Sequence, residues 1–378
     1  MAACTSTLKE RRHWKMLAAG TMAVVFLMLA FSWLRVPGPG LTENRVPTVW
    51  PAWPTTLHEA AALPSRIDAY IQDHFPPRRH FIGWLNYLRY KMGYSGLARV
   101  LAGKDGWLFF NQGHIFYHTG VARLTPDQRR KWAGDFKQRV DAAAAEGASL
   151  FLFLAPEKPS VYPEMLPDWV KATPETEVLD MMASVTPELR SRIVYPLREV
   201  LQEKARHPVF GRYDTHWNGY GGYAGYRALM TAIREVNPDV EGPLPITAFA
   251  LNTTRTQSSL PHDLVGMLGF AHFINIDHPT YSTVPQHDLA RTRFLTDEKD
   301  WWNAQIIKTS SSKDRTLLLV RDSFSAELVP FLKPHFKTMI LAHEWDGYTR
   351  NDLIQQYKPD IVVIETIETS ARRVFGGP

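Results

Sequence analysis

The sequence predicts an α/β fold, a three-layer sandwich with a central, mainly parallel sheet, together with a transmembrane helix at the N-terminus. Two observations predict the sandwich. Five short runs are mostly apolar instead of alternating with polar residues, as strands buried on both faces of a parallel sheet require. Helical patterns lie between several of these runs, where they supply the crossover connections. The apolar runs are 150–154, 192–195, 317–320, 339–342 and 361–364, and the helical patterns cover 127–145 and 218–236.

The transmembrane helix is predicted by a segment of nineteen uncharged residues, 16–34. At about 1.5 Å per residue, this segment nearly spans a hydrocarbon core of about 30 Å. Basic residues before it place residues 1–15 in the cytoplasm by the positive-inside rule, and the rest of the chain across the membrane. They are Lys9, Arg11, Arg12 and Lys15. Two alternatives stay open, a cleaved signal peptide and a buried soluble helix, although the segment is long for the first and lacks the polar face of the second.

Residues 35–60 are rich in proline and predict a linker, which leaves residues 61–378 as one folded domain. Apolar spacing over 65–100 predicts an amphipathic helical cap, and Asp105-Gly106 predicts a turn before a strand-like aromatic run. The stretch 243–312 is rich in Thr, Ser, His and Asp and lacks periodicity. We therefore expect it to be an insertion with short strands.

Composition excludes several classes of protein. With 378 residues, of which 45% are hydrophobic, the chain can bury a substantial core and is not disordered. The net charge of +5 comes with no long basic run and no nucleic-acid motif, so nucleic acid is not a predicted partner. Cys4 is the single cysteine, which excludes an intrachain disulfide and a cysteine-based metal site. No HExxH motif, phosphate loop or dinucleotide fingerprint occurs, so no metal site is predicted.

The segment 214–218 carries a carboxylate and an imidazole two residues apart, Asp214 and His216. In an extended segment this spacing puts both side chains on the same side. A carboxylate can orient a histidine that removes a proton from a nucleophile. The alternative is a polar clasp, or a cap on the helix that is expected to begin near Asn218.

The nucleophile that such a base needs is offered by Ser323, which follows the apolar run 317–320. We expect a short helix to begin near Ser325 and to be ended or kinked by Pro330. This places Ser323 at the carboxyl end of a buried strand, where open α/β sheets bind ligands. The alternative is that Asp322 and Ser323 only cap the short helix.

Three further groups have weaker claims to function. His262-Asp263 repeats the Asp/His chemistry, His343-Glu344-Trp345-Asp346 follows an expected strand, and Trp301-Trp302 offers an aromatic surface for sugar stacking. For each group, a purely structural role in a loop or in packing is the favoured interpretation.

The order of these motifs resembles that of a known family. Asp214-Thr215-His216-Trp217 upstream of Asp322-Ser323-Phe324-Ser325 is similar to the pattern of the SGNH-hydrolase-like polysaccharide O-acetyltransferase family. That family contains the alginate acetylation proteins AlgJ and AlgX and their cellulose-acetylation relatives. Further similar stretches bring the resemblance to roughly residues 65–370. They are 103–109, 155–158, 161–164, 263–269 and 358–363.

The resemblance implies a serine-dependent O-acetyltransferase in which Ser323 accepts the acetyl group, His216 is the general base and acid, and Asp214 orients His216. Arg321 stands where many relatives have glycine. Arg321 and Trp217 are the candidates for substrate binding, and packing beneath the loop is the favoured role of Trp217.

The resemblance also implies the setting of the reaction. The acceptor would be a hydroxyl of an exported bacterial exopolysaccharide, cellulose or an alginate-like polymer, with a slight preference for cellulose. No cofactor is expected, because a membrane-bound acyltransferase that exports acetyl groups would deliver the donor, alongside polysaccharide-export proteins. The catalytic domain would lie in the periplasm, held by a single inner-membrane helix. A polysaccharide acetylesterase with the same triad and a non-catalytic scaffold stay open as alternatives.

Overall fold

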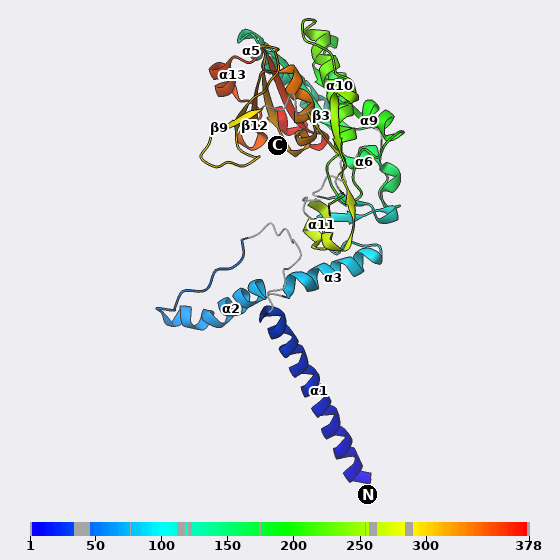
Figure 1. The fold of residues 1–378 in the computed structure, drawn as a ribbon, viewed down its shortest axis with the longest axis vertical. Coiled ribbons are helices and arrows are strands. Elements are labelled where there is room, and N and C mark those ends of the chain that lie inside the picture. The colour runs from blue at the N-terminus through cyan, green and yellow to red at the C-terminus, as the bar shows by residue number, and fades with distance from the viewer. Residues whose placement is uncertain are drawn as a thin grey trace. The chain divides into compact units, whose positions relative to one another are not determined.

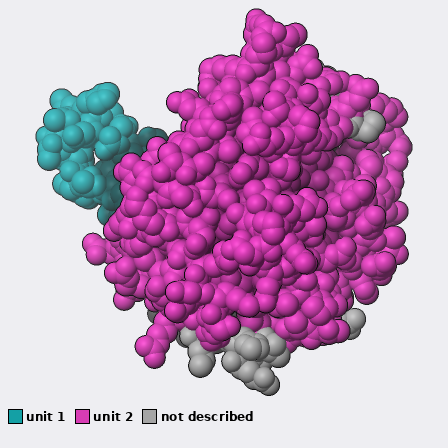
Figure 2. All heavy atoms as spheres, turned by 90° about the horizontal axis from the view of Figure 1, so that it is seen from above, with its two compact units in different colours: residues 1–96, 257–274 teal, residues 97–256, 275–378 magenta. Residues whose placement is uncertain are grey.

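The computed structural model of the protein describes residues 2–33, 46–75, 77–111, 118–119, 123–173, 175–253, 255–256, 263–283 and 290–375. Contacts divide the chain into two compact units, residues 1–96 with 257–274 and residues 97–256 with 275–378 (Figure 2). Parts of the expected linker and insertion lie outside the described residues, namely 35–45, 254, 257–262 and 284–289. The boundaries expected at residues 15, 34 and 60 stay predictions.

The larger unit is built on a seven-stranded mixed sheet. Its strand order is β4 (Ile193–Val194), β3 (Ser149–Ala155), β13 (Ile361–Ile367), β11 (Thr316–Arg321), β12 (Thr338–His343), β10 (Gln305–Lys308) and β9 (Arg291–Phe294). The first five strands are parallel, whereas β10 and β9 are antiparallel to their neighbours. All five apolar runs therefore form strands, as predicted. Strands β9 and β10, which come from the C-terminal part of the expected insertion 243–312, complete the main sheet. The insertion itself stays a prediction.

Helices cover both faces of this sheet (Figure 1). Alternate residues of each central strand point to opposite faces. In β11, Leu318 and Val320 join the core beneath α5 (Pro126–Ala145) and α13 (Asn351–Tyr357). Leu317 and Leu319 join the core beneath α9 (Leu197–Lys204) and α10 (Gly219–Val236). The three layers are confirmed.

Smaller elements connect this framework. The hairpin of β1 (Val100–Ala102) and β2 (Leu108–Phe110) turns through Asp105 and Gly106, both at positive φ, as the Asp-Gly signal predicts. Short sheets pair β5 (Phe249–Asn252) with β8 (Thr280–Thr283) and β6 (Arg255–Thr256) with β7 (Ile276–Asp277). Among the described residues of this unit, further α-helices are α6 (Lys158–Val161), α7 (Glu177–Ser184), α8 (Pro187–Arg190) and α12 (Val329–Leu332).

The smaller unit contains α2 (Leu57–His74), α3 (Arg78–Lys91) and α11 (Asp263–Leu268). Helices α2 and α3 lie where the spacing predicts a helical cap. Aromatic rings hold α3 to the segment around α11, with Trp84 and Tyr87 packed on Phe273 at centroid distances of 4.6 and 5.0 Å. Gly83 permits a close approach there, because a Cβ at this position would lie 2.3 Å from the carbonyl oxygen of Gly269.

The N-terminal helix α1 (Ala2–Trp33) belongs to the same unit. In the part of the chain that the structure describes, no helix combines the length and apolar character needed to cross a membrane. The structure therefore does not support the transmembrane anchor predicted for residues 16–34.

Candidate active site

Ser323 lies directly beyond the carboxyl end of β11 and is partly exposed. It begins a 3₁₀ helix, Ser323–Glu327, which Asp322 caps by accepting the Phe324 N–H at 2.8 Å. Asp322 thus caps the helix, while the Ser323 hydroxyl faces His216. The expected helix is different in detail. Pro330 stands in the first turn of α12 and begins a helix instead of ending one, because its fixed φ suits that position.

Asp214 and His216 lie on a loop that is closed at both ends. A β-bridge pairs Phe210 with Trp217, and Asn218 caps α10 through its side-chain oxygen. The amide of Asn218 also donates to the Pro208 carbonyl at 2.7 Å. These bonds fix the loop to the start of a long helix, so the backbone that carries Asp214 and His216 is held in place.

The structure brings Asp214, His216 and Ser323 into one hydrogen-bonded chain. Asp214 Oδ1 lies 2.8 Å from His216 Nδ1 and also accepts the His216 backbone N–H at 2.8 Å. His216 Nε2 lies 2.8 Å from Ser323 Oγ. The Asp214 side chain is 6% exposed and the His216 side chain 29% exposed. The carboxylate is therefore buried behind the imidazole, and the imidazole and hydroxyl are reachable from solvent.

Trp217 ties the histidine loop to the serine loop. Its side chain is fully buried, and its indole N–H donates to the Phe324 carbonyl at 2.9 Å. Two glycines of α10 leave space for the indole, because a Cβ at Gly221 or Gly225 would lie 2.7 Å from Trp217 atoms. Trp217 packs beneath the loop and presents no surface to a substrate.

Arg321 is also fully buried. Its guanidinium stacks on the Trp301 ring at 3.8 Å and donates to the Trp301 carbonyl. Burial lowers the pKa of Arg321 to about 10, against the opposing effect of the Glu365 and Asp322 carboxyl groups. Within the described residues, its Nε and Nη1 have no hydrogen-bond partner. The structure therefore places Arg321 behind the site and not at its mouth.

Two buried carboxyl groups support the serine loop. Asp322 Oδ2 accepts the Ile367 N–H at 2.8 Å, and Glu365 Oε2 accepts the Asp322 N–H at 3.0 Å. Burial, and then the Glu344 carboxylate, raises the pKa of Asp322 to about 6. Burial and the charge of Asp322 raise the pKa of Glu365 well above its usual range. A neutral Glu365 beside Asp322 avoids two adjacent buried charges.

Sequence reasoning missed one histidine near the triad. His278 Nε2 lies 3.3 Å from Glu327 Oε1, and both side chains are mostly buried. Burial lowers the pKa of His278, but the hydrogen bond and charge of Glu327 outweigh that effect and leave the pKa raised. The carboxylate of Asp214 raises it further. No local pattern around His278 signals this arrangement, because its partners come from distant parts of the chain.

The weaker candidate groups belong to different segments of the chain. His262 lies outside the described residues, and Asp263 begins α11 in the smaller unit. His343 ends β12, and its Nδ1 accepts the backbone N–H of Trp345 at 3.1 Å. Trp301 packs on Arg321, whereas Trp302 and Trp345 are exposed and stack on each other.

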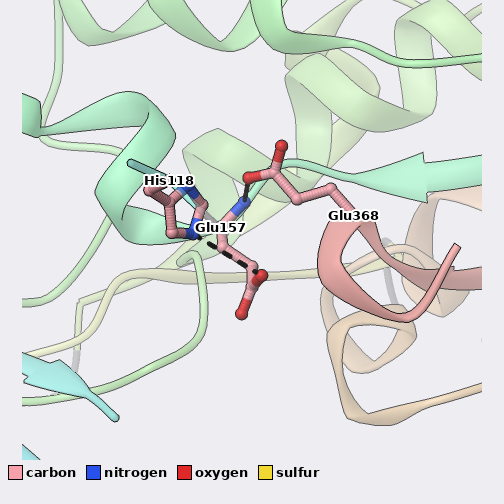
Figure 3. Close-up of side chains that lie close together, drawn as sticks. All are labelled: His118, Glu157 and Glu368. Atoms are coloured by element: carbon pink, nitrogen blue, oxygen red, sulfur yellow. Dashed lines mark hydrogen bonds and ion pairs between the residues drawn. The ribbon is translucent and has the colours of Figure 1, made fainter. Parts of the chain in front are cut away.

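His118, Glu157 and Glu368 form a second polar cluster, from segments far apart in the sequence (Figure 3). All three are buried, and their potential ligand atoms lie within 4.8 Å of one another, as at some metal sites. Both oxygens of Glu368 are already engaged, with the Glu157 N–H at 2.8 Å and the Tyr195 hydroxyl at 2.5 Å. Burial, and then the Glu157 charge, raises the pKa of Glu368 to about 7, which favours a neutral carboxyl over a metal ligand. We interpret the cluster as structural support.

This interpretation predicts a pH-dependent stability. Because the folded state raises the pKa of Glu368 from 4.5 to about 7, its contribution is fully present below pH 4.5 and is lost as pH rises through 7. The gap corresponds to roughly 3 kcal/mol of unfolding free energy at pH 8. We expect Glu368→Gln to lose much less stability than the wild type between pH 5 and pH 8 in urea unfolding. An equal loss of stability between pH 5 and pH 8 in Glu368→Gln and the wild type would contradict the assignment. So would an equally reduced loss in Glu188→Gln, the control at an exposed glutamate.

One cavity in the described part of the larger unit lies away from Ser323. It has a volume of about 360 Å³ and is lined by α5, α13 and sheet residues such as Leu318 and Val320. Those residues face away from the layer that carries α10 and the histidine loop. The cavity is therefore separate from Ser323.

Comparisons with known proteins agree with this architecture. The family model described as an SGNH hydrolase-like domain, acetyltransferase AlgX, matches residues 100–366. The probable alginate O-acetylase AlgJ of Pseudomonas syringae pv. tomato is 24% identical over 314 residues, which cover 79% of this chain and 75% of that protein.

Two solved structures share the fold. Bacillus cereus PatB1 with a sulfonyl adduct superposes with a TM-score of 0.54 at 13% identity, over 73% of this chain and 95% of that one. A DHHW family protein from Eubacterium siraeum superposes with a TM-score of 0.51 at 14% identity, over 73% of this chain and 92% of that one. Since the family model matches well over half of the chain, the protein belongs to the AlgX family of SGNH hydrolase-like acetyltransferase domains.

Proposed function

We propose that this protein is an O-acetyltransferase that carries an acetyl group on Ser323 and passes it to a hydroxyl of an exopolysaccharide. The observation that carries the proposal is the chain of contacts from Asp214 through His216 to Ser323, each with a donor–acceptor distance of 2.8 Å. Such distances lie within the reach of about 2.6–3.2 Å needed for proton transfer. Membership of an acetyltransferase family supplies the acyl group.

In the first half-reaction, His216 Nε2 takes the proton of Ser323 Oγ while Oγ attacks the acetyl carbonyl of the donor. A proton on His216 Nδ1, held by Asp214 Oδ1, leaves Nε2 free to act as the base. The tetrahedral intermediate then expels the donor's leaving group, which receives the proton from Nε2. The product of this step is acetyl-Ser323.

In the second half-reaction, a sugar hydroxyl attacks the acetyl-Ser323 carbonyl and gives its proton to His216 Nε2. The bond to Ser323 Oγ breaks, and the serine oxygen recovers the proton. The partly exposed Ser323 and His216 leave room for the acceptor, while the buried Asp214 stabilises the imidazolium in both steps. Trp217 and Arg321, both fully buried, position the two loops and the strand end.

The proposal also concerns the polymer, the source of the acetyl group and the cellular compartment. The relative from Pseudomonas syringae pv. tomato is named for alginate, and cellulose stays a prediction for this protein. Delivery of the acetyl group by a membrane-bound acyltransferase, association with polysaccharide-export proteins, and action in the periplasm also stay predictions.

Product analysis tests transfer against hydrolysis. The protein is incubated with 4-nitrophenyl acetate and either mannuronate or cello-oligosaccharides, and the sugars are examined by mass spectrometry. We expect acetylated oligosaccharide from at least one acceptor, because the acyl-enzyme waits for a sugar hydroxyl. Release of acetate alone, with every acceptor unmodified, would contradict transfer and indicate an acetylesterase.

A further inference from the structure

Trp302 and Trp345 form an exposed aromatic pair, which we name the Trp302–Trp345 platform. Their ring centroids are 5.6 Å apart with an interplanar angle of 19°, and their exposed fractions are 39% and 76%. Stacking of two large side chains on the surface leaves a broad apolar area in water. Contiguous exposed apolar surface of this kind often marks a binding site.

The platform is held from below. The buried His343 ring contacts Trp302 at 5.2 Å and Trp345 at 4.3 Å between centroids. His343 Nδ1 accepts the backbone N–H of Trp345 at 3.1 Å, and Asp300 Oδ1 accepts the backbone N–H of Trp302 at 3.2 Å. Burial, and then the charge of Arg321, lowers the pKa of His343 to about 4, so the imidazole beneath the platform is neutral near pH 7. Two aromatic rings are thus fixed in place before any ligand binds.

Strand register places the platform and Ser323 at the carboxyl ends of two neighbouring strands, β12 and β11. Arg321 of β11 pairs with His343 of β12, and the two strands are parallel. Ser323 follows Arg321 by two residues, as Trp345 follows His343. Neighbouring strands are about 4.8 Å apart, so the two segments leave the sheet side by side. Trp302 lies near the same strand ends because the preceding residue, Trp301, packs on Arg321.

We propose that the Trp302–Trp345 platform is an acceptor subsite that stacks against a pyranose ring of the polysaccharide next to the ring that is acetylated. This inference rests on the proposed function, because the acceptor there is a sugar polymer. A pyranose ring presents a flat face of C–H groups, which matches an aromatic surface. The hydroxyls at the ring's edge stay in water. Stacking therefore holds the polymer without burying its polar groups.

The test measures acceptor and donor separately. Trp302→Ala, Trp345→Ala and the double variant are prepared in the full chain, with 4-nitrophenyl acetate as donor and, as acceptor, the cello- or mannuronate oligosaccharide that the wild type acetylates. Each single variant should raise the acceptor KM about tenfold, in line with the loss of one aromatic stacking contact. The enzyme should still be acetylated by the ester at the wild-type rate when no acceptor is present. Trp345→Phe should recover part of the affinity.

Trp169→Ala is the matched control, because Trp169 is 65% exposed but follows β3, which is separated from β11 by β13. An unchanged acceptor KM in the double variant would overturn the platform, as would an equal rise in Trp169→Ala. Ser323→Ala, measured in parallel, separates this failure from that of the proposed function. If Ser323→Ala transfers acetyl at the wild-type rate, the proposed function fails and the platform inference fails with it.

Discussion

Ser323→Ala should abolish acetyl transfer to the polysaccharide, with a loss in kcat of about 10⁴-fold or more, because no other group takes the place of a missing nucleophile. The measurement is acetylated oligosaccharide formed per unit time by mass spectrometry. Ser323 is partly exposed, so the variant should fold with an unchanged thermal midpoint. Ser312→Ala, at an exposed serine, should keep full activity and serves as the control. Transfer by Ser323→Ala within a few fold of the wild type would remove the basis of the mechanism.

Asp214→Asn should lower kcat by about 10³–10⁴-fold while leaving the fold intact. Asp214 Oδ1 now accepts from both the His216 backbone N–H and Nδ1, which fixes the proton on Nδ1. An asparagine can keep the backbone bond, but its amide group would donate toward Nδ1 and move the ring proton to Nε2. The nitrogen that faces Ser323 would then be a donor and could no longer act as the base.

Steady-state kinetics and thermal unfolding of Asp214→Asn, side by side, check this expectation. Asp314→Asn is a suitable control, since this carboxylate is 88% exposed and only pairs with Lys337. Activity of Asp214→Asn within threefold of the wild type would show that the carboxylate does not set the tautomer. A large loss of stability would instead assign Asp214 to holding the loop.

The core strands were predictable because each is buried on both faces. Leu317–Val320 of β11, for example, is apolar at every position and needs no knowledge of its neighbours. Strand β9 gives no such signal, because it is an edge strand in which Arg291, Thr292 and Arg293 are exposed. Its place in the sheet depends on pairing with β10, which a pattern along one segment does not reveal.

The three residues of the hydrogen-bonded chain could be named as candidates from the sequence for a related reason. Asp214 and His216 lie two residues apart, and Ser323 follows a strand that is itself recognisable. The groups behind them were not predictable. Glu365 and His278 reach the site from other segments, and their contacts exist only once the strands are assembled.

Arg321 shows how one residue of strand length changes an interpretation. A strand that ends at Val320 would leave Arg321 in the loop, near the substrate. Strand β11 instead includes Arg321, whose side chain follows Leu317 and Leu319 to the face beneath α10. The guanidinium is therefore buried against Trp301. In this position it can hold the end of the strand but does not contact a substrate.

The most direct test of the central claim is to locate the acetyl group on the enzyme. The protein is mixed briefly with 4-nitrophenyl acetate in the absence of sugar, quenched in acid, digested and analysed by tandem mass spectrometry. We expect one acetyl group on the hydroxyl of Ser323, and its disappearance when an acceptor oligosaccharide is added before the quench. Transfer to sugar with Ser323 unmodified at every time point, or an acetyl group on another residue that turns over at the rate of transfer, would contradict the account.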